Sequence, residues 1–154
     1  MITNEIKDND YEALAKLYSS FFTTHNIFQK SEDEVISYLK ESSSKHKLII
    51  FKDNDEVKGA LFLVNFGTAE NGLHKRWKFR HFAFTSEEIA TDLLLEAEKT
   101  IQNASKTAKI ELNITETEES IDFYKQHGYE QEGELKNHFR WGETCFVLAK
   151  SFSS

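Results

Sequence analysis

The residues best suited to chemistry lie near the end of the chain, in the run IDFYKQHGYEQEGELKNHFRWGETCFVLAK at positions 121–150. The run opens with a short segment of helical periodicity, 121–127, that ends at Gly128. Two alternating segments around a loop at Trp141 follow, and this pattern predicts a β-hairpin. The helix carries Tyr124, whose phenol hydroxyl is a group that could do chemistry. The alternative is an aromatic side chain that only packs the helix against a sheet.

The charge balance and the single cysteine narrow the function classes. The chain has 154 residues, with 19 Lys and Arg against 26 Asp and Glu, for a net charge of −7. Nucleic-acid binding needs a cationic face, so no nucleic-acid partner is expected, whereas amines and cationic peptides suit an acidic chain. Cys145 alone allows neither an internal disulfide nor a cysteine metal cluster, so we expect a cytoplasmic protein without a metal site. No membrane-spanning apolar run and no signal-peptide pattern is present, so no membrane partner is expected. A homodimer is possible.

Periodicity and breaker residues predict one α+β domain over residues 1–154. Helical patterns begin near Asn9, Ser31, Thr85 and position 121, and extended patterns cover 2–6, 48–51, 57–66, 73–85, 108–114 and the hairpin. The resulting order is β-α-α-β-β-β-α-β-α-β-β. Because a crossover helix separates 73–85 from 108–114, these two strands should be parallel.

Several positions can be assigned to the core or to helix caps. The apolar run at 60–64 predicts a strand buried on both faces. Inward-facing stripes are predicted at Tyr11, Leu14, Tyr18 and Phe21, at Ala90, Leu94, Ala97 and Ile101, and at Ile110, Leu112 and Ile114. Capping boxes are predicted at Ser31-x-x-Glu34, Thr85-x-x-Glu88 and Thr115-x-x-Glu118.

The strand at 73–85 has an interrupted pattern. Lys78 and Arg80 share one parity with Phe82 and Phe84, so the polar–apolar alternation breaks between residues 80 and 82. Such a break predicts a β-bulge or entry into a doubly covered part of the sheet.

The motif FYxxxGY, followed by ExEGxLxNHxRxGExCxVLxK, resembles the C-terminal half of the GNAT superfamily of acetyl-CoA-dependent N-acyltransferases. The predicted order of elements matches that family across nearly the whole chain. The resemblance implies a mixed, mostly antiparallel twisted sheet of six to seven strands flanked by about four helices. It also implies transfer of an acetyl group from acetyl-CoA to an amine acceptor, either a small amine or a peptide amine.

The resemblance further implies roles for individual residues. An amine attacks the thioester directly, and backbone N–H groups near Phe82, Ala83 and Phe84 stabilise the oxyanion. Tyr124 protonates the departing thiolate. Thr117 stands near the place of a cofactor-contacting asparagine of the family.

The loop that binds the CoA pyrophosphate in the family, Q/R-x-x-G-x-G/A, corresponds here to 85–90, TSEEIA. The implied cofactor contacts are Glu88, Ile89, Ala90 and Thr91, but only Ala90 matches the motif, because Glu88 stands at the glycine position. Carboxylates in the first turn of a helix stabilise the helix yet repel a diphosphate at the same place. Three basic residues could compensate if the fold brings them close: Lys75, Arg76 and Arg80.

No general base is evident from a motif. By resemblance, His81 and Glu111 lie on the two strands that flank the cofactor, and either could take an amine proton through water. A lone histidine on a strand is more often structural. His138 and Arg140 are candidates for the acceptor side, and Cys145 suits a buried hydrophobic position better than a nucleophile. The alternative to an enzyme is a catalytically inactive GNAT-fold binding or interaction module that no longer uses acyl-CoA.

Overall fold

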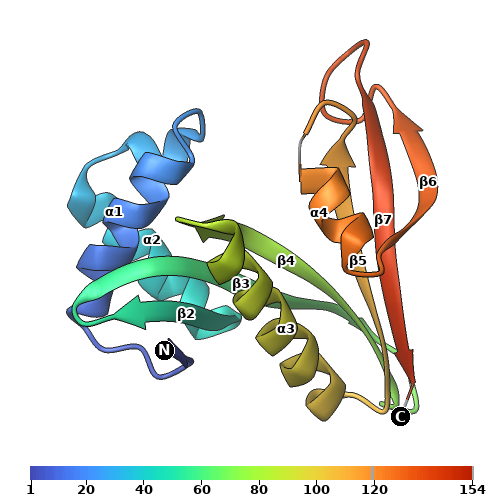
Figure 1. The fold of residues 1–154 in the computed structure, drawn as a ribbon, viewed down its shortest axis with the longest axis horizontal. Coiled ribbons are helices and arrows are strands. Elements are labelled where there is room, and N and C mark those ends of the chain that lie inside the picture. Colours follow the sequence, from blue (N-terminus) through green and yellow to red (C-terminus); the bar gives the residue numbers. More distant parts are fainter. Residues whose placement is uncertain (119, 154) are drawn as a thin grey trace. The chain divides into compact units, whose positions relative to one another are not determined.

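The computed structural model describes residues 1–118 and 120–153 (Figure 1). The predicted order of elements is confirmed, with a short 3-10 helix, η1, added between the first two helices. The elements are β1 (Ile2–Thr3), α1 (Asp10–Phe21), η1 (Asn26–Gln29), α2 (Glu32–Lys45), β2 (Lys47–Asp53), β3 (Glu56–Thr68), β4 (His74–Phe84), α3 (Glu87–Ala104), β5 (Thr107–Thr115), α4 (Ser120–Gln126), β6 (Glu130–Lys136) and β7 (Thr144–Ser153).

The strands form one seven-stranded sheet in the order β1-β2-β3-β4-β5-β7-β6. The pairs β1–β2, β2–β3, β5–β7 and β6–β7 are antiparallel. β4 and β5 are parallel, with His74 opposite Thr107 and Trp77 opposite Ile110, as the crossover helix between them requires. The predicted α+β class, with a mixed and mostly antiparallel sheet, is therefore confirmed.

The chain divides into two compact units. The N-terminal unit contains Met1–Val64 and Phe79–Thr100, and the C-terminal unit contains Asn65–Lys78 and Ile101–Ser154. The boundaries fall inside β3, β4 and α3. The single domain expected from the length of the chain stays a prediction.

The core of the N-terminal unit lies between β2 and β3 and the two helices α1 and α2. Residues 60–64 are all buried, as the apolar run predicts. Leu14 and Tyr18 of α1 are fully buried, but Phe21 is 39% exposed, so its predicted inward position is wrong. Phe21 is the last residue of α1, where the helix reaches the end of the layer it covers.

Helix α3 follows its predicted stripe, since Ala90, Leu94, Ala97 and Ile101 are all fully buried. Its start packs closely on β3 at Gly59, where an added Cβ would lie 2.6 Å from side-chain atoms of both Ile89 and Leu93. A side chain at this position would therefore force the first turns of α3 away from the sheet.

The C-terminal unit shows the alternation predicted for β5. Ile110, Leu112 and Ile114 are buried, while the residues between them are not. α4 ends two residues before Gly128, whose φ of +90° suits glycine at the end of a helix. Among the helices of the described residues, none is both long enough and apolar enough to cross a membrane.

One of the three predicted capping boxes is confirmed. The Ser31 hydroxyl accepts a hydrogen bond from the Glu34 N–H at 3.3 Å. The box at Thr85 is wrong, because the Ser86 hydroxyl accepts the bond from the Ile89 N–H, and the Thr85 N–H donates to Lys58 O instead. The box at 115–118 is also wrong: these residues form a turn, and α4 begins at Ser120.

Candidate functional site

The predicted site residues fall into two sets, one in each unit. The N-terminal unit holds the end of β4 and the start of α3, and these contain His81, 82–84 and 88–91. The C-terminal unit holds Glu111 on β5, Thr117 and Tyr124.

The break in the alternation of β4 lies at His81. This residue has a φ of +53°, in the left-handed region that non-glycine residues rarely adopt. The rings of Phe79 and Phe82 lie 6.2 Å apart, although residues three apart in a regular strand point to opposite faces. The predicted interruption between residues 80 and 82 is therefore confirmed, and its conformation is one found in β-bulges.

The imidazole of His81 is surrounded by aromatic residues of the segment 18–38, which contains η1 and parts of α1 and α2, and of β3. Its Nε2 lies 2.7 Å from the hydroxyl oxygen of Tyr38 on α2, within hydrogen-bonding distance. Five rings contact it edge-on, at centroid distances of 4.9–6.1 Å: Tyr18, Phe22, Phe28, Tyr38 and Phe62. Burial, with smaller contributions from the charges of Arg80 and His25, lowers the pKa of His81 to about 4. The ring is therefore neutral at pH 7.

A left-handed residue inside a strand carries a conformational cost of roughly 1–3 kcal/mol. Such residues persist only where the surrounding structure holds them, and they gather at functional sites. In a regular strand the N–H groups point alternately to the two neighbouring strands. A left-handed residue interrupts that alternation, so the direction of the N–H groups that follow it differs from that in a regular strand.

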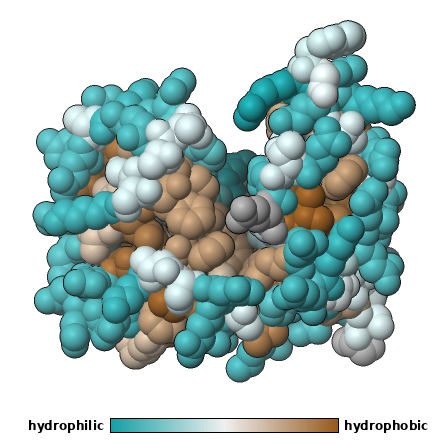
Figure 2. All heavy atoms as spheres, turned by 45° about the horizontal axis from the view of Figure 1, so that its top comes forward, coloured by the Kyte–Doolittle hydropathy of each residue, from teal (hydrophilic) through white to brown (hydrophobic). Residues whose placement is uncertain are grey.

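Phenylalanines continue from the bulge to the end of α1. The rings of Phe22, Phe21, Phe84, Phe82 and Phe79 follow one another, with neighbouring centroids 4.9–6.2 Å apart. None of the five side chains is fully buried. Figure 2 shows hydrophobic residues at the surface of this unit among the hydrophilic ones. An apolar strip beside a bulge suits an uncharged, extended ligand.

The start of α3 differs from a phosphate-binding loop in charge and in shape. Glu87 and Glu88 are both exposed in the first turn of the helix. Ala90 is fully buried, so its side chain faces the core, and Ile89 packs over Gly59. These residues do not form a glycine-lined cradle, and two carboxylates oppose a diphosphate there. The predicted contacts at 88–91 remain untested.

The three basic residues that could compensate have other partners. Lys75 Nζ donates to the carbonyl of Ala104, the last residue of α3 and so at the opposite end of that helix from Glu87. The guanidinium of Arg76 lies over the ring of Phe66, at 4.3 Å from its centroid. Arg80 Nη1 lies 3.4 Å from His46 Nε2 at the end of α2.

Tyr124 lies in the C-terminal unit with 7% of its surface exposed. Its ring contacts Phe123 and Tyr129, each at 5.3 Å between centroids. Burial, and then the charge of Glu118, raise the pKa of its hydroxyl well above the usual value near 10. The phenol therefore keeps its proton at neutral pH, and because the raised pKa also makes it a weaker acid, donation of that proton requires close positioning.

Glu111 stands between two cations. Its carboxylate lies 3.8 Å from Lys109 Nζ and 3.9 Å from Arg76 Nε. Lys109 also pairs with Glu132 of β6, and that hydrogen bond is the main cause that raises the pKa of Lys109. Thr117 is exposed in the turn after β5, with its hydroxyl 3.5 Å from that of Thr115.

The loop between β6 and β7 is stabilised by hydrogen bonds within the loop. The Gly142 N–H donates to the Asn137 side chain at 2.7 Å, and Trp141 is 91% exposed at the tip. His138 and Arg140 are exposed in the same loop. Cys145 is 1% exposed, and burial raises the pKa of its thiol, which fits a packing position and not a nucleophile.

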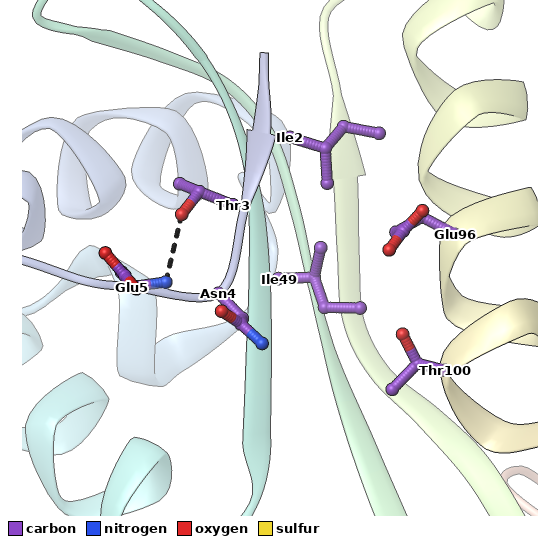
Figure 3. Close-up of a pocket in the computed structure, with 7 residues that line it drawn as sticks. All are labelled: Ile2, Thr3, Asn4, Glu5, Ile49, Glu96 and Thr100. Carbon is purple, nitrogen blue, oxygen red and sulfur yellow. Dashed lines mark hydrogen bonds between the residues drawn. The ribbon is translucent and has the colours of Figure 1, made fainter. Parts of the chain in front are cut away.

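Two recesses lie in the N-terminal unit, and neither contains a predicted site residue. In the first, of about 200 Å³, Ile2 and Ile49 point toward Glu96 and Thr100 of α3 (Figure 3). The second, of about 410 Å³, lies along η1 and α2 and is lined by Ile27, Lys30, Asp33, Glu34, Ser37, Tyr38 and Glu41. The second recess has three carboxylates against one lysine, a balance that suits a cation. Within residues 1–118 and 120–153, no group of three His, Cys, Asp or Glu side chains is placed to hold a metal ion.

Tyr38 is the residue at this site that the sequence did not indicate. The helical stripe of α2 assigns Val35, Ile36 and Leu39 to the core and leaves Tyr38 beside it. An aromatic residue at the margin of an apolar stripe is the only signal, and it does not reveal a partner on a strand 43 residues away.

No protein-family model matches the chain, and no curated protein matches its sequence. Solved structures do match its fold. The aminoglycoside 6'-N-acetyltransferase from Enterococcus faecium is 17% identical, with a TM-score of 0.74 over 98% of this chain and 96% of that one. An aminoglycoside 6'-N-acetyltransferase solved with coenzyme A is 16% identical, with a TM-score of 0.73 over 98% and 96%. The ribosomal-protein-alanine N-acetyltransferase from Brucella melitensis is 14% identical, with a TM-score of 0.69 over 99% of each chain. The chain therefore has the fold of the GNAT acetyltransferases.

Proposed function

We propose that this protein is an N-acetyltransferase that moves an acetyl group from acetyl-CoA to an amine. The observation that carries the proposal is the left-handed residue His81 inside β4 of a GNAT fold. Residues in an energetically unfavourable backbone conformation gather at functional sites. One that lies beside the predicted oxyanion-binding residues therefore supports a site for an acyl group.

In the proposed reaction, the amine nitrogen attacks the thioester carbonyl carbon, and negative charge develops on the carbonyl oxygen. The N–H groups of 82–84 stabilise that oxyanion. The carbon–sulfur bond then breaks, and the thiolate takes the hydroxyl proton of Tyr124. The phenolate recovers a proton from solvent, and the attacking nitrogen loses one through water to a base.

Of the two predicted bases, Glu111 is the better candidate for the proton of the amine. His81 already shares its Nε2 with Tyr38, and an imidazole with a pKa of about 4 takes up protons poorly at pH 7. Glu111 is on β5 and is only partly buried, and its carboxylate forms ion pairs with Lys109 and Arg76.

The acceptor is proposed to be a cationic small amine or a peptide amine. The net charge of −7 favours such acceptors, as does the recess in which Asp33, Glu34 and Glu41 oppose Lys30. Of the three solved structures named above, two are aminoglycoside N-acetyltransferases and one is a ribosomal-protein-alanine N-acetyltransferase, so the same fold serves both acceptor classes.

A second candidate is a binding module that no longer takes acyl-CoA. The exposed Glu87 and Glu88 at the start of α3 favour it, because they oppose a diphosphate where the family binds one.

Calorimetric titration of the chain with acetyl-CoA and with CoA separates the two candidates. The acetyltransferase predicts saturable binding of both, followed by release of free thiol when amines are added to the acetyl-CoA complex. No binding of either nucleotide at millimolar concentration, with a folded chain by circular dichroism, would contradict the enzyme and favour the module.

A further inference from the structure

His81 differs from the other non-glycine residues of positive φ among the described residues. Asn54 and Asn137 adopt φ near +55° in turns, where asparagine tolerates the left-handed region. His81 adopts it inside a strand, where the regular ladder favours an extended residue. Something other than local preference must hold it there.

The contacts of the His81 side chain can keep the residue in this conformation. The Tyr38 hydroxyl lies 2.7 Å from Nε2, and the five surrounding rings all meet the imidazole edge-on, at 66–85°. If residue 81 relaxed to an extended conformation, the imidazole would leave this enclosure and the Tyr38 hydroxyl would lose its partner. Arg80 adds a second contact to α2 at His46. Contacts with α2 and with His46, which follows it, therefore hold β4 at the residue where the alternation breaks.

We propose that the Tyr38–His81 hydrogen bond holds residue 81 in its left-handed conformation and so fixes the direction of the backbone N–H groups of Phe82 and Ala83. Tyr38 and His81 are then positioning residues, which act on the acyl group through the backbone and not by direct contact. We call this effect of the Tyr38–His81 hydrogen bond on residue 81 the lock. The binding of an acyl carbonyl by those N–H groups rests on the proposed acetyltransferase function, but the lock itself does not.

The lock is tested in the free protein by Tyr38→Phe, which removes one hydroxyl and keeps the ring. The Cα and Cβ chemical shifts of residues 80–82 distinguish left-handed from extended backbone. They should move toward extended values in the variant. Tyr11→Phe is the matched control, because the Tyr11 hydroxyl makes a similar bond, 2.6 Å to Ser43 Oγ, that joins α1 to α2. Shifts that stay left-handed in folded Tyr38→Phe would overturn the lock.

The catalytic consequence is tested by turnover with acetyl-CoA. Tyr38→Phe should lower kcat about 10-fold or more with little change in KM for acetyl-CoA, because misdirected donors act mainly on the transition state. Tyr11→Phe should keep the wild-type kcat. Equal kcat in wild type and Tyr38→Phe would overturn the positioning role.

A pair of substitutions at residue 81 separates positioning from proton transfer. His81→Asn and His81→Leu both remove the imidazole, but asparagine tolerates the left-handed region and leucine does not. Positioning predicts that His81→Asn keeps several-fold more kcat than His81→Leu. Equal loss in two folded variants would point to the imidazole as a base and overturn the proposal. If the wild-type chain binds neither acetyl-CoA nor CoA, the proposed function fails, and the chemical shifts alone decide the lock.

Discussion

At the scale of single residues, burial shifts the pKa of two predicted catalytic residues, Tyr124 and His81. Tyr124 keeps its proton because burial and Glu118 disfavour the phenolate. His81 stays neutral because burial and the nearby charges of Arg80 and His25 disfavour the imidazolium. An uncharged imidazole suits a positioning group, whereas the phenol of Tyr124 needs close positioning to act as an acid, because its raised pKa makes it a weaker one.

Tyr124→Phe tests the assignment of the general acid. If the hydroxyl protonates the departing thiolate, kcat should fall by ~10²-fold or more, while KM for acetyl-CoA stays nearly unchanged. Stability should change little, since the ring contacts with Phe123 and Tyr129 remain. Steady-state kinetics on a proven amine acceptor make the measurement. Equal kcat in the two proteins would show that Tyr124 only packs α4 against the sheet.

His81 should make the stability of the protein depend on pH. The unfolded chain protonates this imidazole near pH 6.5 and the folded protein only near pH 4, so between these values the unfolded chain binds more protons. The free energy of unfolding should therefore fall as the pH is lowered from 6.5 to 4, by up to about 3 kcal/mol from this group.

The comparison with His81→Asn isolates that contribution, because asparagine does not titrate. Urea unfolding of both proteins at pH 7 and pH 4 should show a larger loss of stability in the wild type. Parallel losses would mean that His81 is not buried as an uncharged ring.

At the scale of elements, the register of α3 depends on one backbone bond. Thr85 and Ser86 can both cap a helix, but the Thr85 N–H donates to Lys58 O at 2.9 Å and so continues the pairing with β3. Ser86 is left to accept the bond from the Ile89 N–H at 3.2 Å. The pairing of Thr85 with β3 therefore determines where α3 begins, and Ser86 is the residue in position to cap it.

Ser86→Ala should lower the free energy of unfolding by about 1 kcal/mol, the usual effect of a lost N-cap. Thr85→Ala is the matched control, since it removes the neighbouring hydroxyl together with one methyl group, and it should have a clearly smaller effect. Thermal or urea unfolding of the two variants makes the comparison. A larger effect at Thr85 than at Ser86 would restore the capping box that the sequence predicts.

At the scale of the whole molecule, stability in the N-terminal unit depends on a buried ion pair between the start of α1 and β2. The side chains of Asp10 and Lys52 are only 3% and 16% exposed. Burial would raise the pKa of Asp10, but hydrogen bonds from Lys52 and from the Lys7 N–H outweigh it and lower that pKa. The pair joins segments that are 42 residues apart in the chain.

Asp10→Ala should lower the free energy of unfolding by about 3–5 kcal/mol, because it leaves the Lys52 ammonium without its buried partner. Asp8→Ala is the control: Asp8 pairs with Lys40 at 3.7 Å, but its side chain is 96% exposed, so the change should stay within about 1 kcal/mol. Urea unfolding at pH 7 measures both. Equal effects would show that Lys52 finds water or another acceptor.

The sequence by itself determined the order of elements, the α+β class and the buried stripes. These follow from local periodicity and breakers, which act over a few residues, so Ala90, Leu94, Ala97 and Ile101 could be assigned to the core without coordinates. It also located the interruption in β4, because parity along one strand is a local property.

Only the tertiary structure decided what that interruption does. Phe21 is exposed because α1 ends there. Ser86 caps α3 because the Thr85 N–H is hydrogen-bonded to the carbonyl of Lys58. The left-handed φ of His81 is opposed by local preference and is stabilised by Tyr38, 43 residues earlier, and by rings from α1, η1, α2 and β3. Contacts between segments so distant in the chain exist only once the helical layer has packed on the sheet, and no local pattern encodes them.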